Sequence, residues 1–326
     1  MRRSHTARPL LWPLVPVYRL GLAVRERRFR PGSPAMRRLH WPVVGVGNLS
    51  TGGSGKTPLT IALAKALRAR GLHVDVLSRG YGRRSALPLL VDPGGTAEEF
   101  GDEPLEIARA AHVPVYVAAE RYEAGLLAER DAGGQSGVHL LDDGFQHRQL
   151  YRDFDILLLN RADLADHLLP AGGLREPLRA ARRAHVIAIP GDEPELEAVI
   201  RSRGWGAEIW RLRRHMEVPA INGSAAAFCG IARPEQFFTG LERAGVQLAA
   251  RFSFRDHHAY TKADLDRIET RVRKVGAKTL LTTAKDRVRL GSSTTNLPIE
   301  TVPLRVEIED EKAAIDWLMG RLKDRG

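Results

Sequence analysis

Cysteine is nearly absent from the chain, because Cys229 is the single cysteine among 326 residues. One cysteine excludes an internal disulfide and a metal site built from several cysteines. Small secreted domains commonly depend on disulfides, so this composition favours a cytosolic protein. The sequence also lacks internal repeats and low-complexity tracts, and its length suits one large α/β domain or two domains.

Acidic residues are scarce in the first 40 residues, where ten arginines accompany a single acid, Glu26. This segment carries +9 of the net charge of +11, so the other 286 residues carry only +2. A nucleic-acid-binding protein usually has its positive charge along a groove or helix face of the folded domain. The placement of charge therefore predicts no nucleic-acid partner, and no feature of the sequence indicates an obligate protein partner.

A hydrophobic run long enough to cross a membrane is also lacking. Residues 10–24 are rich in leucine and valine, but they fall short of the ~20 residues that a span needs, contain Arg19, and are broken by Pro13 and Pro16. Helical spacing places on one face Leu11, Leu14, Val15, Tyr18 and Leu22. We expect residues 1–40 to form an amphipathic element at a membrane interface, with arginines toward anionic head groups. A core helix and a cleaved signal peptide are the alternatives.

A glycine-rich stretch follows the apolar, β-prone run that begins at Val43. It reads Gly-Gly-Ser-Gly-Lys-Thr over residues 52–57, and an amphipathic segment with helical spacing comes next. Strand, glycine-rich turn and helix are the parts of a phosphate-binding loop, or P-loop. The strict pattern has glycine five positions before Gly55, where this chain has Ser50. A glycine-rich turn that only caps a helix is the alternative.

The P-loop interpretation gives each residue of the stretch a role. Glycines let successive backbone N–H groups point at one anion, and the start of the helix adds a favourable dipole. Lys56 would reach the β- and γ-phosphates of ATP, and the Thr57 hydroxyl would bind Mg²⁺. The predicted nucleotide-binding residues are Ser50, Thr51, Gly52, Gly53, Ser54, Gly55, Lys56 and Thr57.

Strand-like and helix-like segments alternate after the P-loop. Strands are expected at residues 74–78, 113–117, 138–141, 155–159 and 185–189. This alternation predicts an α/β fold of the P-loop NTPase kind, with a mainly parallel sheet and helices on both faces. The pattern loosens near residues 204–206, and we place a boundary near residue 208. Beyond it, strands are expected at residues 225–229, 248–254, 279–283 and 301–306, and helices at residues 234–244 and 262–275. The expected parts are an N-terminal interface helix (1–40), a P-loop core (41–208) and a smaller C-terminal α/β domain (209–326).

Asp142 follows a strand-like run about 85 residues after Lys56. A carboxylate that holds Mg²⁺ or its water is expected at such a place in P-loop enzymes. Asp143 is its neighbour, and on an extended backbone the two side chains would point to opposite faces, so only one could easily face the nucleotide. An ordinary turn at the end of a strand is the alternative.

Asp102 and Glu103 stand at an expected helix start, where an N-cap with an acidic first turn is the plain interpretation. The functional interpretation is a base and a metal ligand, since a kinase must orient an acceptor hydroxyl and accept its proton. His257 follows Asp256 in a loop of the second part, and an imidazole oriented by a carboxylate could accept a proton. A surface histidine is the alternative. A metal site at His257 and His258 would lack a third ligand at good spacing.

Loops at expected strand ends carry several cationic candidates for binding an anionic substrate. These are Arg79, Arg83, Arg121, His147 and Arg175. Most loop arginines are only solvated, so each alone says little. All of them are expected beyond the carboxyl ends of parallel strands, where ligands bind in such sheets. This shared position supports a role for the group in binding an anionic substrate.

Together these motifs resemble the tetraacyldisaccharide 4′-kinase family, the lipid A 4′-kinases. The motifs are, in order, VGN-x3-GG-x-GKTP (46–58), SRGYGR (78–83), GDEP (101–104), DDGFQH (142–147), LPAG-x-LREP (169–177), F-x-DHH-x-Y (254–260) and TTAKD (282–286). The resemblance spans nearly the whole chain, including the arginine-rich N-terminus. It implies a P-loop fold on the cytoplasmic face of the inner membrane. The implied reaction transfers the γ-phosphate of ATP to the 4′-hydroxyl of a tetraacylated glucosamine disaccharide 1-phosphate.

The resemblance also implies roles for particular residues. Asp102 would be the base for the acceptor hydroxyl, and His257 would pair with it from the second part of the chain. Glu103 and Asp142, with Thr57, would hold Mg²⁺. Contacts to the phosphorylated sugar would come from Arg121, His147 and Arg175. Within this family, Ser50 is an ordinary P-loop residue.

Two other classes of protein share parts of this pattern. One is a P-loop ATPase or GTPase switch of the partitioning or metal-insertion type. Partitioning ATPases commonly carry a lysine where this chain has Thr51, and the TAKD stretch only partly matches a base-reading motif. The other is a nucleic-acid-binding ATPase, which the near-neutral charge beyond residue 40 argues against.

Overall fold

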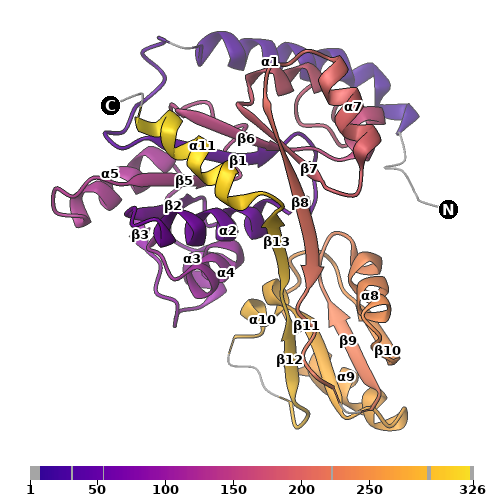
Figure 1. Cartoon of the computed structure of the whole chain (residues 1–326). Helices are drawn as coiled ribbons and strands as arrows, with labels where there is room; N and C mark the ends of the chain where they lie inside the picture. The colour runs from indigo at the N-terminus through magenta and orange to yellow at the C-terminus, as the bar shows by residue number, and fades with distance from the viewer. Residues whose placement is uncertain (1–7, 31, 54, 222, 292–294, 324–326) are drawn as a thin grey trace.

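The protein is described from a computed structural model that covers residues 8–30, 32–53, 55–221, 223–291 and 295–323. Its strands form two sheets, one of nine strands and one of four. Figure 1 shows the larger sheet with its helices as the main body, and the smaller sheet beyond one edge of it.

The nine-stranded sheet has the strand order β13-β8-β7-β6-β1-β5-β2-β4-β3. All its neighbours pair in parallel except β3 and β13, the two edge strands. In chain order the strands are β1 (Val43–Asn48), β2 (Val74–Ser78), β3 (Leu89–Leu90), β4 (Val115–Val117), β5 (Val138–Asp142), β6 (Phe154–Leu158), β7 (Val186–Pro190), β8 (Glu208–Met216) and β13 (Leu304–Ile308). Every residue of β1, β2, β4, β5 and β6 is buried, as expected when helices cover both faces.

Helices cover both faces of this sheet, which confirms the predicted α/β fold. Because side chains alternate along a strand, Val44 and Val46 of β1 enter the core on one face, whereas Val43 enters the core on the other. The first core holds α2 (Lys56–Ala69), α4 (Asp102–Ala111) and α11 (Glu311–Lys323). The opposite face carries α5 (Arg121–Asp131), η2 (Leu178–Arg183) and α7 (Pro194–Ser202). The short helices α3 (Ala97–Phe100) and α6 (Arg161–Ala165) lie in connecting segments.

The four-stranded sheet is entirely parallel, in the order β10-β9-β11-β12. Its strands are β9 (Ala225–Cys229), β10 (Leu248–Ser253), β11 (Thr279–Thr283) and β12 (Ile299–Val302). One face packs on α9 (Lys262–Lys274) and the other on α8 (Pro234–Arg243). A third helix, α10 (Ala284–Leu290), leaves β11 and packs against α4 of the larger body.

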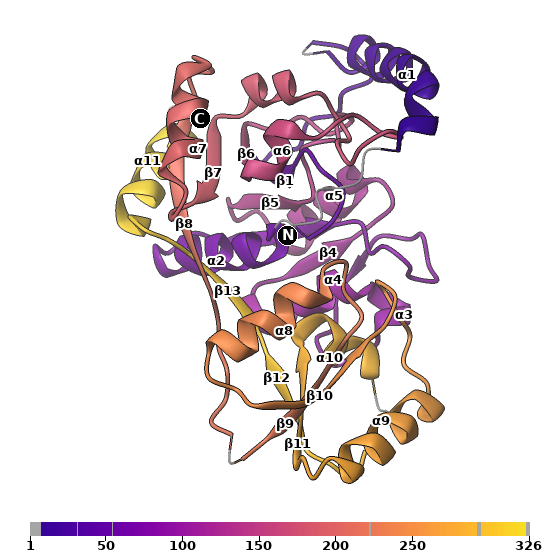
Figure 2. The same cartoon turned by 90° about the vertical axis from the view of Figure 1, so that its right-hand side faces the viewer.

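The chain passes between the two bodies at other places than the expected boundary near residue 208. Strand β8 pairs with β7, and β13 returns antiparallel to β8, so both belong to the larger sheet (Figures 1 and 2). The sequence predicts a single strand across residues 301–306. Pro303 divides it, because proline cannot donate to a strand ladder, and β12 and β13 lie in different sheets.

The N-terminal segment forms η1 (Pro9–Leu14) and α1 (Val15–Arg28), at the other end of the molecule from the smaller sheet (Figure 1). Within the described ranges no helix is long and apolar enough to cross a membrane. The apolar stripe expected at the membrane mostly faces inward, since Val15, Tyr18 and Leu22 pack on the core. Leu14 of the expected stripe is exposed, and so is a second apolar set that consists of Leu10, Trp12, Val17, Leu20 and Val24.

Candidate active site

The P-loop connects β1 to α2, as the sequence predicts. Gly52 and Gly55 have φ angles of 108° and 90°, the left-handed region that glycine enters without steric cost. Ser50 is buried and is not among the residues with positive φ, so its place does not require glycine. It pairs instead with Leu174 of the 168–177 loop. Ser54 was also expected here and lies outside the described residues.

Lys56 begins α2 and is held over the loop. Its Nζ donates to Asn48 Oδ1 at 3.1 Å and lies 3.5 Å from Asp143 Oδ1. The side chain is 12% exposed, so it lies at the mouth of the site. Thr57, the next residue, is buried at the same helix end. A lysine between two acceptors at the start of a helix that follows a glycine-rich loop can exchange these contacts for phosphate oxygens.

Both aspartates at the end of β5 lie beside the P-loop, although only one was expected to face the nucleotide easily. Asp142 accepts a hydrogen bond from the Thr60 hydroxyl of α2 at 3.1 Å. Asp143 has a φ of 50°, which ends the strand alternation and turns its carboxylate to Lys56 and Arg175. Burial, then the nearby charges of Glu103 and Asp143, raise the pKa of Asp142 to about 7.

Asp102 is buried at the start of α4 and links the two bodies of the molecule. Its Oδ2 accepts from His257 Nδ1 at 3.0 Å and from Arg289 Nε at 2.8 Å, both from the smaller body. Burial alone would raise the pKa of Asp102, but these two partners outweigh burial and lower it. The hydrogen bond to Asp102 in turn raises the pKa of His257. The predicted pair is therefore assembled, and the carboxylate is ionised at neutral pH.

Glu103, the next residue, pairs with Lys285 of α10 at 2.6 Å. In the described part of the chain no group of three or more acidic, histidine or cysteine side chains forms a ready metal cage. Even so, Asp142 and Glu103 are near enough for one to raise the pKa of the other. Two carboxylates that repel one another beside the Thr57 end of α2, the buried Asp142 and the partly exposed Glu103, suit a divalent cation bound jointly with phosphate oxygens. The predicted Mg²⁺ residues thus fit the ion.

A second set of side chains suits an anion. Burial and Arg79 lower the pKa of Arg121 to about 10, and burial and Arg121 lower the pKa of His147 to about 3. The Nε of Arg121 and the Nε2 of His147 are buried and have no hydrogen-bond partner among the described residues. Two mutually repelling arginines, one of them with an unsatisfied N–H, favour a bound anion, and the anion would also favour the protonated form of His147. Arg175 is connected to this set through Asp143, which accepts a hydrogen bond from Arg175 and whose charge also acts on Arg121.

A family model described as tetraacyldisaccharide-1-P 4′-kinase (LpxK) matches residues 7–323. The chain belongs to this kinase family. A tetraacyldisaccharide 4′-kinase of Koribacter versatilis is 43% identical over 324 residues, with 96% of this chain and 99% of the relative covered. The corresponding protein of Parvibaculum lavamentivorans is 37% identical, with 97% and 92% covered.

A solved structure of the 4′-kinase family has the same architecture. It is LpxK from Aquifex aeolicus in complex with ATP, which is 33% identical. The alignment has a TM-score of 0.77 and covers 97% of this chain and 99% of that chain. The match therefore extends over both sheets and is not limited to the P-loop.

Sequence reasoning missed several residues of this 4′-kinase site. Asn48 and Lys285 lie within the VGN and TTAKD motifs, so both were in view, but nothing showed that they pair with Lys56 and Glu103. Arg289 follows TTAKD by three residues on α10. One helical turn places it beside Asp286, and only the packing of α10 on α4 brings it to Asp102.

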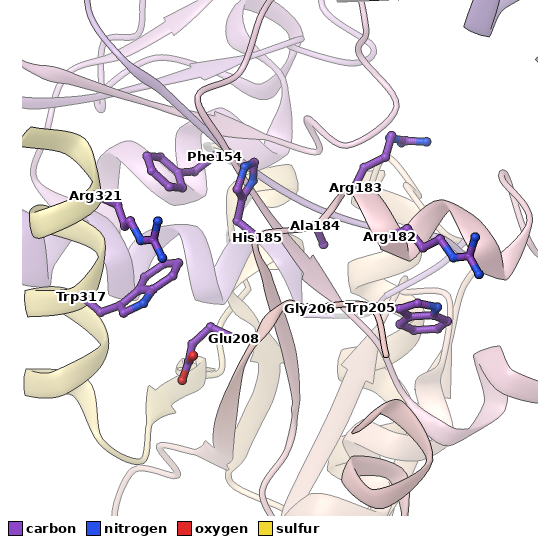
Figure 3. A pocket seen from close by; sticks show the side chains of 10 residues that line it. All are labelled: Phe154, Arg182, Arg183, Ala184, His185, Trp205, Gly206, Glu208, Trp317 and Arg321. Atoms are coloured by element: carbon purple, nitrogen blue, oxygen red, sulfur yellow. The ribbon is translucent and has the colours of Figure 1, made fainter. Parts of the chain in front are cut away.

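The hollow drawn in Figure 3 is not part of this site. It has a volume of about 540 Å³ and is lined by residues that include Phe154, His185 and Glu208, at the amino ends of β6, β7 and β8. The P-loop lies at the carboxyl end of β1, which is parallel to β6. The hollow therefore lies at the amino ends of the parallel strands, and the P-loop lies at their carboxyl ends.

Proposed function

We propose that this protein is an ATP-dependent kinase that transfers the γ-phosphate to the 4′-hydroxyl of a tetraacylated glucosamine disaccharide 1-phosphate. The observation that carries the proposal is the pairing of Asp102 with His257 across the two bodies, on the side of the sheet that holds the P-loop. A phosphate-binding loop alone would suit any NTPase, whereas an oriented acid–base pair suits transfer to a hydroxyl.

The nucleotide would be held by residues 50–57. Loop N–H groups and Lys56 would neutralise charge on the β- and γ-phosphates as it shifts during transfer. When bound, Mg²⁺ supplies further charge neutralisation, and Thr57, Glu103 and Asp142 are the residues proposed to hold it. Thr60 keeps the Asp142 carboxylate oriented.

Asp102 and His257 would receive the proton of the acceptor hydroxyl as one coupled pair. Arg289 and His257 occupy one oxygen of Asp102. Among the described residues, the other oxygen accepts a hydrogen bond from the N–H of Glu103 alone, so it can also take a hydroxyl. The acceptor oxygen then forms its bond to phosphorus as the β–γ bridging bond breaks, which leaves ADP. Arg121, His147 and Arg175 would bind the phosphorylated sugar.

The membrane contact is proposed for α1 and η1, on the cytoplasmic face of the inner membrane. Val17 and Leu20 are 68% and 66% exposed, and arginines flank them on the same helix. An apolar face with neighbouring cations binds anionic lipid surfaces. Val17→Asp with Leu20→Asp should reduce co-sedimentation with anionic vesicles, and undiminished binding would contradict this placement.

One assay tests the activity directly. Purified protein with labelled ATP, Mg²⁺ and the tetraacyl disaccharide 1-phosphate should yield a bisphosphorylated lipid, and Lys56→Met should abolish the product. ATP hydrolysis that needs no lipid, without lipid product, would instead favour a P-loop ATPase.

A further inference from the structure

The inward side of α1 contacts the loop that carries Arg175. The Tyr18 hydroxyl donates to the backbone oxygen of Arg175 at 2.8 Å. About two helical turns further along, Arg25 binds the buried carboxylate of Glu176 at 3.1 Å. Both contacts join segments about 150 residues apart in the sequence, so they depend on how α1 docks. They involve the side of α1 opposite to its exposed apolar residues.

Arg175 is fixed from three directions. Its N–H donates to Leu49 O of the P-loop at 2.7 Å, and its carbonyl accepts from Tyr18. Its guanidinium donates to Asp143 Oδ2 at 2.8 Å and to Gln146 Oε1 at 3.3 Å. Because both peptide groups of the residue are held, the direction of its side chain is set by α1 as well as by the P-loop.

Glu176 contributes less to this link. Its side chain is 4% exposed and binds Arg148 and Arg183 in addition to Arg25. Loss of Arg25 would leave two cations on the carboxylate, so the loop would keep much of its order. Among the described residues, no other donor than Tyr18 is hydrogen-bonded to the Arg175 carbonyl.

We propose that Tyr18, supported by Arg25, is a positioning residue that aims Arg175 at the phosphorylated lipid substrate. This role rests on the proposed function. Helix α1 then has two separable tasks: its outer side meets the lipid surface, and its inner side sets the geometry of a substrate-binding arginine. A helix that only anchors the protein would need the outer side alone.

The test uses the full chain and detergent-dispersed tetraacyl disaccharide 1-phosphate, so that membrane binding is not required. Tyr18→Phe removes one hydroxyl and keeps the ring in its packing. We expect the KM for the lipid to rise about 3- to 10-fold, as for one lost hydrogen bond, with the KM for ATP, the Tm and vesicle binding unchanged. Arg25→Met should raise the KM for the lipid by about 2-fold, because Glu176 keeps two partners.

Two comparisons separate positioning from anchoring and from general stability. Val17→Asp with Leu20→Asp should lose vesicle binding yet keep the wild-type KM for dispersed lipid. In an Arg175→Ala background, Tyr18→Phe should not raise the KM for the lipid any further, because Tyr18 acts through Arg175. The positioning role alone would be overturned if Tyr18→Phe left the KM for the lipid unchanged. It would also be overturned if Tyr18→Phe raised this KM by the same factor in the Arg175→Ala background as in the wild type. A wild-type protein without lipid product would overturn the proposed function and this role together.

Discussion

At the scale of single residues, the Asp102–His257 pair has the sharpest consequence for activity. Asp102→Asn keeps the shape but removes the charge that Arg289 and His257 bind. General acid–base groups typically contribute 10²–10⁴-fold, so we expect kcat to fall by about that factor. Affinity for ATP should be nearly unchanged, because the hydrogen-bond partners of Asp102 in the described part of the chain are Glu103, His257 and Arg289, none of which belongs to the P-loop. Single-turnover kinetics and nucleotide titration measure the two quantities, and unchanged turnover would reject the role.

The pH profile follows from the same pair. Asp102 has a lowered pKa and stays ionised, while His257 has a raised pKa and loses its proton at a higher pH than an ordinary histidine. If the pair must accept a proton, kcat/KM should rise with pH as the pair deprotonates. Asp102→Asn removes the cause of the raised pKa of His257 and should move this ascending limb to lower pH. A pH–rate profile with the same limb in both proteins would contradict the coupling.

His139 shows that a buried titratable group can serve the fold alone. It lies between Asp75 at 2.7 Å and Glu129 at 3.3 Å, and although burial opposes the shift, Asp75 and Glu129 raise its pKa to about 9. A raised pKa means that its stabilisation is complete below the ordinary value of 6.5 and is lost as pH rises through about 9. His139→Gln should lower stability by about 3–5 kcal/mol at pH 6, and by less at pH 9.5. Denaturant unfolding measures this, with exposed His215→Gln as the control.

At the scale of elements, the strand–loop–helix of the nucleotide site depends on left-handed glycines. Gly55→Ala would place an L-residue at φ 90° and a Cβ 3.3 Å from the Arg214 guanidinium. The left-handed conformation costs roughly 1–2 kcal/mol, so the loop should leave its phosphate-binding form. We expect ATP affinity to fall at least 10-fold with a small change in Tm. Gly21→Ala on α1 has nothing within 4 Å of its Cβ and should leave ATP binding unchanged. Equal ATP affinities in the two variants would contradict this account.

The elements themselves were largely predictable. Strands β2 and β9 have the predicted bounds, and helix α9 differs from its predicted range by one residue. Local pattern and capping determine such segments. The outcome for α1 was different. Its apolar residues occur on more than one side, so spacing alone could not decide which side meets the core.

At the scale of the whole molecule, Arg289 joins the two bodies. Its side chain is 5% exposed and binds Asp102, Asp286 and the Gly230 carbonyl. Arg289→Met would leave the buried carboxylates of Asp102 and Asp286 without their cation, and we expect the free energy of unfolding to fall by about 3–5 kcal/mol. The pKa of Asp102 would rise toward its ordinary value. Lys285→Met breaks the pair with Glu103, whose two side chains are 28% and 29% exposed, and should lower the free energy of unfolding much less. Denaturant unfolding of both variants tests the ranking, and equal losses would contradict it.

The expected boundary near residue 208 also belongs to this scale. Strands β8 and β13 have an alternating pattern that suits any half-buried strand pair, so nothing local assigns them to one sheet. Their antiparallel pairing beside β7 brings residues 304–323 back to the larger body. A chain that crosses between bodies twice cannot be divided at one point.

The order of motifs along the sequence was enough to determine the family, the P-loop and the residues of the Asp102–His257 pair. These depend on residue type and local spacing, which the chain carries wherever it folds. Tertiary structure alone decided that Arg289 and Lys285 reach across to Asp102 and Glu103, and that Tyr18 holds Arg175. Contacts between segments more than 150 residues apart depend on sheet order and helix docking, which arise from the packing of all the elements at once.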